Sequence, residues 1–172
     1  MKEDFGRSAR PRPNRSSTSG EGLCVAIPSS PCERKRREAP DDGATRLDRV
    51  EPDLNEATPG DRRDTTTPAA MADNLAKLVV GDALSAQSRD RLSAWMVANT
   101  TGDKRLRAGA PKGWRVGGKT GSGGHAETND VAVFWPPDRG PIAIAAYYAA
   151  SAEPDDARNG VLAEVGRLAA MV

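Results

Sequence analysis

Apolar residues recur at helical spacing in three stretches of the chain. The first stretch begins at Pro68, directly after the candidate N-cap Thr67, and ends at Gly81. A second helix is expected after Ser85. A third runs from about residue 155, and its apolar stripe consists of Val161, Leu162, Val165, Leu168 and Val172. These spacings predict three helices that each bury one face.

Three other stretches have the composition of strands. In residues 114–123, Trp114 and Val116 form the apolar side of a strand that contains several glycines, and residues 131–135 and 142–150 are apolar on both faces. Residues 136–140 form a short Pro/Gly turn, so the last two strands form an antiparallel hairpin. Because both of these strands are apolar on two sides, each face of the sheet should be covered. We therefore predict an α+β fold of the layered sandwich type, an antiparallel sheet of three strands flanked by helices.

The first 67 residues show neither period. Residues 1–40 are rich in Pro, Ser and Arg and contain the basic cluster 34–37, a composition that predicts disorder. Residues 41–67 form a long polar loop in which Leu54 is the expected buried anchor. The domain organisation predicted is a disordered segment over 1–40 and a folded unit over 41–172.

Composition excludes several function classes. The chain has 172 residues, 37% of them hydrophobic, with 25 Lys and Arg against 24 Asp and Glu for a net charge of +1. This balance predicts no binding to nucleic acid or membrane, and no apolar run reaches the length of a membrane span. Residues 1–5 lack the apolar core of a signal peptide, and Cys24 and Cys32 fit no metal or redox spacing.

Candidate chemistry gathers at the glycine-rich strand. Lys119 and Thr120 sit among bare backbone, where a cation, hydroxyls and exposed N–H groups suit an anionic ligand. A glycine-rich strand end without function is the alternative. The single histidine, His125, is expected to be exposed rather than catalytic.

Several motifs, in register, resemble one family. Residues 49–55 read Arg-Val-Glu-Pro-Asp-Leu-Asn, residues 65–72 follow as a helix start, and residues 99–102, 119–123 and 129–130 surround the glycine-rich strand. From residue 41 to 172 the chain resembles the C-terminal half of the class A serine β-lactamases, whose motif set includes Lys-Thr-Gly. The fold implied is β-lactamase/transpeptidase-like, with its N-terminal half missing.

The resemblance implies a catalytic pair on different elements. Glu51 would be the general base that activates water for hydrolysis of the acyl-enzyme, and Asn55 would help to hold that water. Lys119 would stabilise negative charge on the substrate. Without the resemblance, Glu51 reads as an ordinary solvated loop acid.

The resemblance also implies a substrate-binding edge and a supported loop. The hydroxyls of Thr120 and Ser122, with Gly121 between them and Arg105 nearby, would bind the β-lactam carboxylate, and the Ser122 N–H would be half of an oxyanion hole. The structural roles implied are an ion pair between Arg49 and Asp64 and a cis bond between Glu51 and Pro52. The alternatives are a solvated turn position for Arg105 and an exposed ion pair of little energetic weight.

The acylation residues of the family have no counterpart here. No serine has a lysine three residues later, and no Ser-Asp-Asn occurs. Gly118 also stands where the family often has Asp. We expect a truncated or rearranged β-lactamase reading frame, inactive alone, whose residues 1–40 are non-homologous or out of frame. Without the missing half, the strand residues Val131, Phe134, Ile142 and Ile144 would lack a partner surface.

The remaining expectations follow from the family. The substrate would be a β-lactam antibiotic, with no metal or other cofactor, and the protein a monomer. The intact family is periplasmic or secreted. Two alternatives stay open: a relative of the penicillin-recognising peptidases, which share Lys-Thr-Gly, and a non-enzymatic interaction protein with a basic tail.

Overall fold

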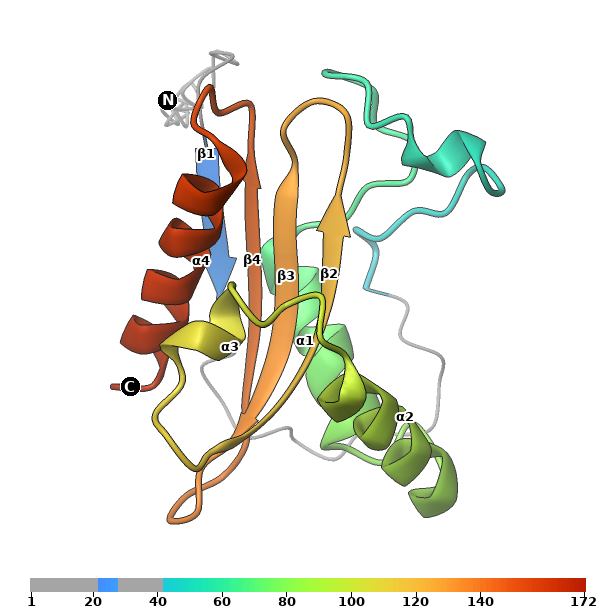
Figure 1. The fold of residues 1–172 in the computed structure, drawn as a ribbon. Helices are drawn as coiled ribbons and strands as arrows, with labels where there is room; N and C mark the ends of the chain where they lie inside the picture. Colours follow the sequence, from blue (N-terminus) through green and yellow to red (C-terminus); the bar gives the residue numbers. More distant parts are fainter. Residues whose placement is uncertain (1–21, 28–41) are drawn as a thin grey trace, which may run out of the picture.

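The computed structural model describes residues 22–27 and 42–172, which form one sheet with helices on both faces (Figure 1). The elements in chain order are β1 (Gly22–Ala26), the 3-10 turn η1 (Asp53–Asn55), α1 (Pro68–Val79), α2 (Ala86–Ala98), α3 (Leu106–Gly109), β2 (Arg115–Ser122), β3 (Thr128–Trp135), β4 (Ile142–Ala149) and α4 (Asp155–Ala169). The α+β class and the antiparallel sheet are as predicted.

The sheet has four strands in the order β1-β4-β3-β2, all antiparallel. The prediction of three strands was therefore incomplete, and the prediction of disorder is wrong for β1. Leu23 and Val25 lie across from Tyr148 and Ala146, so a short apolar run supplies backbone partners for the edge of β4. The rest of residues 1–40 lies outside the described residues.

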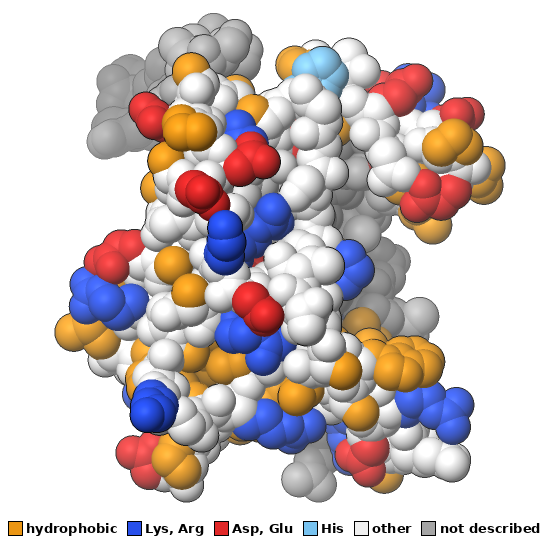
Figure 2. All heavy atoms as spheres, viewed as in Figure 1, with side chains coloured by type: hydrophobic (Ala, Val, Ile, Leu, Met, Phe, Trp, Pro, Cys, Tyr) orange, Lys and Arg blue, Asp and Glu red, His pale blue; other side chains and the backbone are white. Residues whose placement is uncertain are grey.

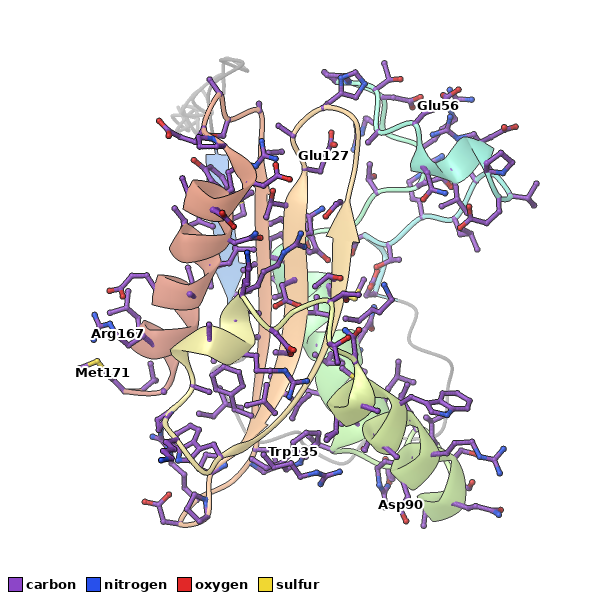
Figure 3. The ribbon with its side chains drawn as sticks, in the orientation of Figure 1. Glu56, Asp90, Glu127, Trp135, Arg167 and Met171 are labelled. Carbon is purple, nitrogen blue, oxygen red and sulfur yellow. The ribbon has the colours of Figure 1, made fainter. Side chains whose placement is uncertain are left out.

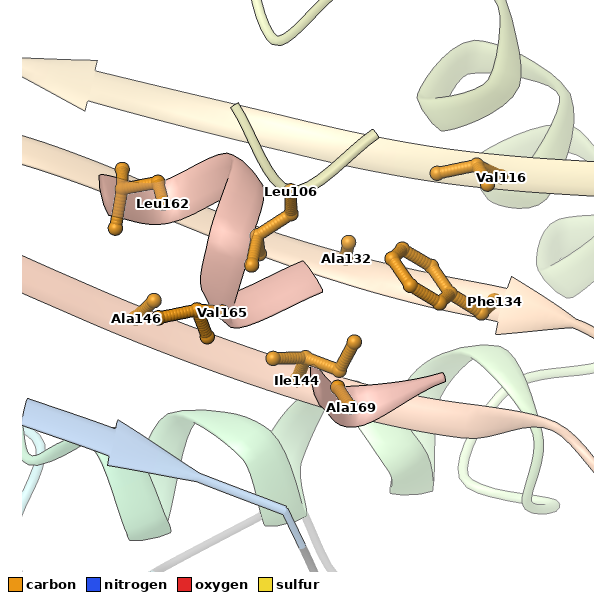
Figure 4. Packing of buried hydrophobic residues seen from close by; sticks show 9 residues of the cluster. All are labelled: Leu106, Val116, Ala132, Phe134, Ile144, Ala146, Leu162, Val165 and Ala169. Carbon is orange, nitrogen blue, oxygen red and sulfur yellow. The ribbon is translucent and has the colours of Figure 1, made fainter. Parts of the chain in front are cut away.

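One face of the sheet packs against α3 and α4. Its core joins Leu106 from α3 to residues of the three long strands and of α4, as Figure 4 shows, namely Val116, Ala132, Phe134, Ile144, Ala146, Leu162, Val165 and Ala169. Trp114 meets Phe134 edge to face, with ring centroids 6.2 Å apart. Phe134 and Ile144 are fully buried, and Val131 and Ile142 pack partly buried against the two cores, so the expectation that these residues lack a partner surface is wrong.

The opposite face packs against α1 and α2. This second core contains Leu75, Val79, Met96, Val133 and Ala143. Val133 follows Ala132 on β3 and points to the other side, as strand alternation requires. Both faces are thus covered, which confirms the inference from the doubly apolar strands.

The starts of α1 and α2 were predicted from capping chemistry, and they are confirmed. The Thr67 side chain accepts a hydrogen bond of 3.2 Å from Ala70 N, and Ser85 accepts one of 3.3 Å from Ser88 N. One local prediction was wrong, because Leu54 is only half-buried and η1 contains no buried residue. The short helix α3 was not predicted from the sequence. Among the described residues, no helix is both long and apolar enough to cross a membrane.

Candidate functional site

The outer edge of β2 presents the backbone groups of every second residue. The Gly118 carbonyl accepts a hydrogen bond of 2.9 Å from Asn99 Nδ2 and therefore points away from β3. In an antiparallel strand, the N–H and C=O of one residue point to the same side, and the side alternates from one residue to the next. The backbone N–H and C=O groups of Thr120 and Ser122 therefore also point away from β3. The Thr120 carbonyl accordingly accepts a bond of 2.7 Å from Lys119 Nζ. The Ser122 N–H thus faces the open side of the sheet.

Arg105 holds this end of the sheet from the α3 side. Its Nη2 donates to Ser122 Oγ at 2.7 Å, and its Nη1 donates to the carbonyls of Asn129 at 2.7 Å and Gly121 at 3.1 Å. Its Nε donates to Asn159 Oδ1 on α4 at 2.9 Å. Four acceptors fix the planar guanidinium beside the strand end, and Arg105 is half-buried. The alternative of a freely solvated turn arginine is excluded.

A turn after α2 completes the edge. Thr101 Oγ1 lies 2.6 Å from Thr120 Oγ1, and Asn99 Oδ1 accepts from the N–H and the hydroxyl of Thr101 at 3.2 Å and 2.9 Å. Asn99 therefore joins β2 through its amide nitrogen and orders the turn through its oxygen. Neither Thr101 nor Asn99 was given a role from the sequence, although both lie in a motif that the sequence identified.

Arg107 and Lys119 have separate surroundings. Arg107 Nη2 donates to carbonyls at the end of α2, at 3.2 Å to Val97 and 3.0 Å to Asn99, so it caps that helix. Lys119 is exposed and projects to the face opposite Thr120. Arg107 is structural, whereas the ammonium group of Lys119 is placed at the edge of the sheet.

The loop before α1 is held by ion pairs. Arg49 Nε lies 2.6 Å from Asp64 Oδ2, and the two side chains are only 14% and 5% exposed. Asp64 Oδ1 also accepts from the N–H groups of Asp48 and Arg49 at 2.7 Å and 3.0 Å. The hydrogen bond from Arg49 is the largest cause of the lowered pKa of Asp64. The predicted pairing of Arg49 with Asp64 is present in the structure, and it is not an exposed contact.

Glu51 and Asn55 contact one another on this loop. Asn55 Nδ2 donates to Glu51 Oε2, and the Glu51–Pro52 bond is cis, as the resemblance implied. Both side chains are exposed. The loop lies beyond the β2 edge of the sheet, and Figure 3 places Glu56 on it well apart from Glu127 of the β2–β3 turn.

The residues of the predicted site therefore fall into two separate clusters. Arg105, Thr120, Gly121 and Ser122 form one cluster, and Glu51 with Asn55 forms another. Within the described part of the chain, the side chains of Glu51, Asn55 and Lys119 make no hydrogen bond or ion pair from one cluster to the other. No cluster of three or more His, Cys, Asp or Glu residues that could hold a metal occurs among the described residues. His125 is exposed, as expected.

Asp130 is a feature that sequence reasoning named only as part of a motif. It faces Thr120 across the β2–β3 pair and is 2% exposed. Burial raises its pKa to about 7, against weaker opposing effects from the Leu106 N–H and from the guanidinium groups of Arg105 and Arg107. The signal in the sequence that could have singled it out is an acidic residue directly before the apolar run 131–135.

Comparison with known proteins identifies the family. The sequence profile described as the Beta-lactamase enzyme family matches residues 37–171. The chain is 55% identical over 127 residues to the β-lactamase AST-1 of Nocardia asteroides, with 74% of this chain and 41% of that protein covered. The chain belongs to the class A β-lactamase family. It is also 48% identical over 127 residues to OXY-2 of Klebsiella oxytoca, covering 74% of this chain and 44% of that protein.

Solved class A β-lactamases share the fold. An ancestral class A β-lactamase, GNCA, superposes with a TM-score of 0.72 at 64% identity, covering 74% of this chain and 49% of the other. The putative class A β-lactamase PenP of Rhodopseudomonas palustris gives 0.74 at 51% identity, covering 77% and 51%. The chain thus spans less than half the length of the curated class A β-lactamases it matches and about half of these solved chains.

Proposed function

We propose that this chain carries the substrate-recognition edge and the deacylation base of a class A β-lactamase. The observation that supports this best is the cluster at the end of β2, where Arg105 donates to Ser122 Oγ while the N–H of Ser122 faces outward. A cation, two hydroxyls and a free edge are the groups needed to hold a carboxylate and to stabilise a developing oxyanion. The substrate would be a β-lactam that bears a carboxylate.

Glu51 is the proposed general base. Its carboxylate is exposed and already accepts a hydrogen bond from Asn55, so the two groups together offer a water both an acceptor and an oriented neighbour. The ion pair between Arg49 and Asp64 joins the two ends of the same loop. Lys119 supplies a positive charge at the outer edge of β2, where its Nζ donates to the Thr120 carbonyl at 2.7 Å.

The nucleophile has to come from residues that this sequence does not contain. No serine in the 172 residues has a lysine three positions later. The chain alone is therefore expected to bind a β-lactam without forming an acyl adduct. Class A β-lactamases are generally periplasmic or secreted, and we infer the same location for an intact protein of this kind.

Complementation tests the proposal. The purified chain alone is expected to show no turnover of a chromogenic cephalosporin and no covalent adduct by mass spectrometry. Addition of a polypeptide with the part of the Nocardia asteroides relative that this chain does not match should restore hydrolysis. With Glu51→Gln, the acyl-enzyme should accumulate on the added polypeptide while turnover falls at least about a hundredfold.

Asp53→Asn is the matched control, because Asp53 is an exposed acid two residues away on the same loop. It should leave the restored hydrolysis unchanged. Hydrolysis by the chain alone would contradict the proposal, since it would require a nucleophile that the motif analysis does not recognise. Unchanged deacylation in Glu51→Gln would remove Glu51 from the mechanism.

The penicillin-recognising peptidases are the second candidate. They share Lys-Thr-Gly with this chain, but here a glutamate and an asparagine also contact one another on an ion-paired loop. That arrangement favours hydrolysis of the acyl-enzyme. Slow deacylation in the complemented protein that Glu51→Gln does not change would favour the peptidase.

A further inference from the structure

Asp130 is a buried acid with half of its hydrogen-bonding capacity unused. Its Oδ2 accepts a hydrogen bond of 3.1 Å from the N–H of Leu106, the first residue of α3. Its Oδ1 has no hydrogen-bond partner among the described residues. An unpartnered buried oxygen is costly, and a side chain kept in such a place requires an explanation.

The start of α3 depends on this contact. Arg105 is the N-cap residue of α3, yet its side chain makes no capping hydrogen bond because the guanidinium is directed at the strand end. The carboxyl of Asp130 takes over that role from the neighbouring strand. Asp130 therefore binds the N–H of the residue that directly follows Arg105, and Arg105 in turn binds Ser122.

Asp130 also supports the turn that reaches Thr120. A Cβ built on Gly102 would lie 3.3 Å from Thr120 Cγ2 and 3.5 Å from Asp130 Oδ2. Gly102 follows Thr101, whose hydroxyl bonds that of Thr120. The Asp130 carboxyl therefore packs against Gly102, at the point where the turn lies close to β2.

We propose that Asp130 is a positioning residue of the substrate edge, which acts through Arg105 without touching the ligand. This inference rests on the function proposed above. By fixing the N-terminus of α3 and the floor of the turn, Asp130 sets the guanidinium of Arg105 against Gly121, Ser122 and Asn129. Loss of the carboxyl should release Arg105 and weaken the binding of a carboxylate-bearing β-lactam.

Only one acceptor atom is needed for this role. Since burial raises the pKa of Asp130 to about 7, the side chain is mostly neutral at pH 6, and a neutral amide can replace it there. The charged groups that face it come from α3, Arg105 and Arg107, while the residues of β2 on this face, Gly118 and Thr120, carry no charge. Asp130→Asn is therefore the conservative variant and Asp130→Ala the disruptive one.

The test has two readouts, both on the whole chain at pH 6. The first is the NMR signal of the Arg105 Nε–H, which the bond to Asn159 should protect from exchange in the absence of any ligand. The second is titration with benzylpenicillin, followed at the Thr120 and Ser122 amides. Asp130→Ala should abolish the protected signal and weaken binding at least tenfold. Asp130→Asn should retain the signal and bind within about threefold of the parent chain.

Two controls separate positioning from general destabilisation. Val165→Ala removes methyl groups from the same core and should lower Tm while leaving the Arg105 signal and the Kd unchanged. In an Arg105→Ala background, Asp130→Ala should cause no further loss of binding, because the effect passes through Arg105.

Three results would overturn the inference: a protected Arg105 signal in Asp130→Ala, a Kd unchanged in that variant, or an equal loss of binding with and without Arg105. If the parent chain binds no benzylpenicillin, the proposed function fails in this respect, but the Arg105 Nε–H signal still decides whether Asp130 positions Arg105.

Discussion

Burial of Asp130 couples its protonation to folding. The carboxyl has its pKa raised from 3.8 to about 7 in the folded chain, so the folded state holds a proton that the unfolded state releases at lower pH. The contribution of Asp130 to the free energy of unfolding is largest below about pH 4. It falls as pH rises toward 7, because the unfolded state binds fewer protons than the folded state in this window. The loss amounts to about 4 kcal/mol at most, at 1.36 kcal/mol for each pKa unit.

Asp130→Asn replaces the titrating carboxyl with an amide that does not ionise. The free energy of unfolding of the variant, measured by urea denaturation between pH 4 and pH 8, should decline less over that range than that of the parent chain. Equal slopes would show that Asp130 ionises in the folded state as it does in the unfolded one.

The residues of the site differ in how well the sequence reveals them. Glu51, Lys119 and Ser122 belong to contiguous motifs, so a role for each could be proposed from the sequence. The roles of Asn129, Asn159 and Asp130 depend on which element lies opposite them, and α3 and α4 meet β3 only in three dimensions. Spacing along the chain carries no signal for such contacts.

At the scale of elements, the loop before α1 depends on one carboxylate. The pKa of Asp64 is lowered, chiefly by the Arg49 hydrogen bond, so its stabilising effect is present above the pKa of an unfolded aspartate and is lost as pH falls. Asp64→Asn should reproduce that loss at neutral pH. Asn tolerates the positive φ of 54° at this position, so the substitution tests charge rather than backbone fit.

Amide hydrogen exchange measures the effect on the loop. The N–H groups of Asp48 and Arg49, which donate to Asp64, should exchange at least about twofold faster in Asp64→Asn, because the ion pair with Arg49 is mostly shielded from solvent. Exchange in α4 should not change. A slower or unchanged rate in the loop would show that the backbone bonds hold it without the charge.

Two glycines let α3 and α4 touch. A Cβ on Gly166 would lie 2.2 Å from the Leu106 carbonyl oxygen, and one on Gly109 would lie 1.9 Å from that of Ala163. Gly166→Ala must therefore push α3 away from α4, at a cost of about 1–3 kcal/mol or more in unfolding free energy. Arg105 would move with α3.

Gly160→Ala is the matched control on the same helix. Nothing lies within 4 Å of its Cβ position, so alanine should stabilise α4 by about 0.5–1 kcal/mol. Thermal melts of the two variants should shift in opposite directions. A melt of Gly166→Ala at or above that of the parent chain would contradict the close packing of α3 on α4.

Element prediction succeeded where a pattern was long and failed where it was short. The helix α1 has a clear period and an N-cap, and the strands β3 and β4 are long apolar runs on either side of a short turn. The four residues of α3 are too few to show a period, and its stability comes from Asp130 and from packing on α4. The strand β1 is five residues in a polar segment, and its pairing depends on the free edge of β4.

At the scale of the whole molecule, the described residues form a layered unit in which the sheet lies between two layers of helices. The sheet is covered on both faces, and basic and acidic side chains lie in small separate groups over the face shown in Figure 2. Large apolar side chains nonetheless remain exposed, with Leu47 at 79%, Val50 at 77% and Trp95 at 66%. These belong to the loop before α1 and to α2, so they lie outside both cores.

The position of β1 at the end of the sheet has a consequence for the order of folding. Its register joins Gly22 to Ala149 and closes a loop of most of the chain, whereas β2, β3 and β4 are joined by hairpins. Loop-closure entropy grows with the logarithm of loop length, and non-local pairs form late. In pulse-labelled refolding, amides of β3 should gain protection before those of β1. The outer edge of β2 would then be assembled before β1 pairs with β4.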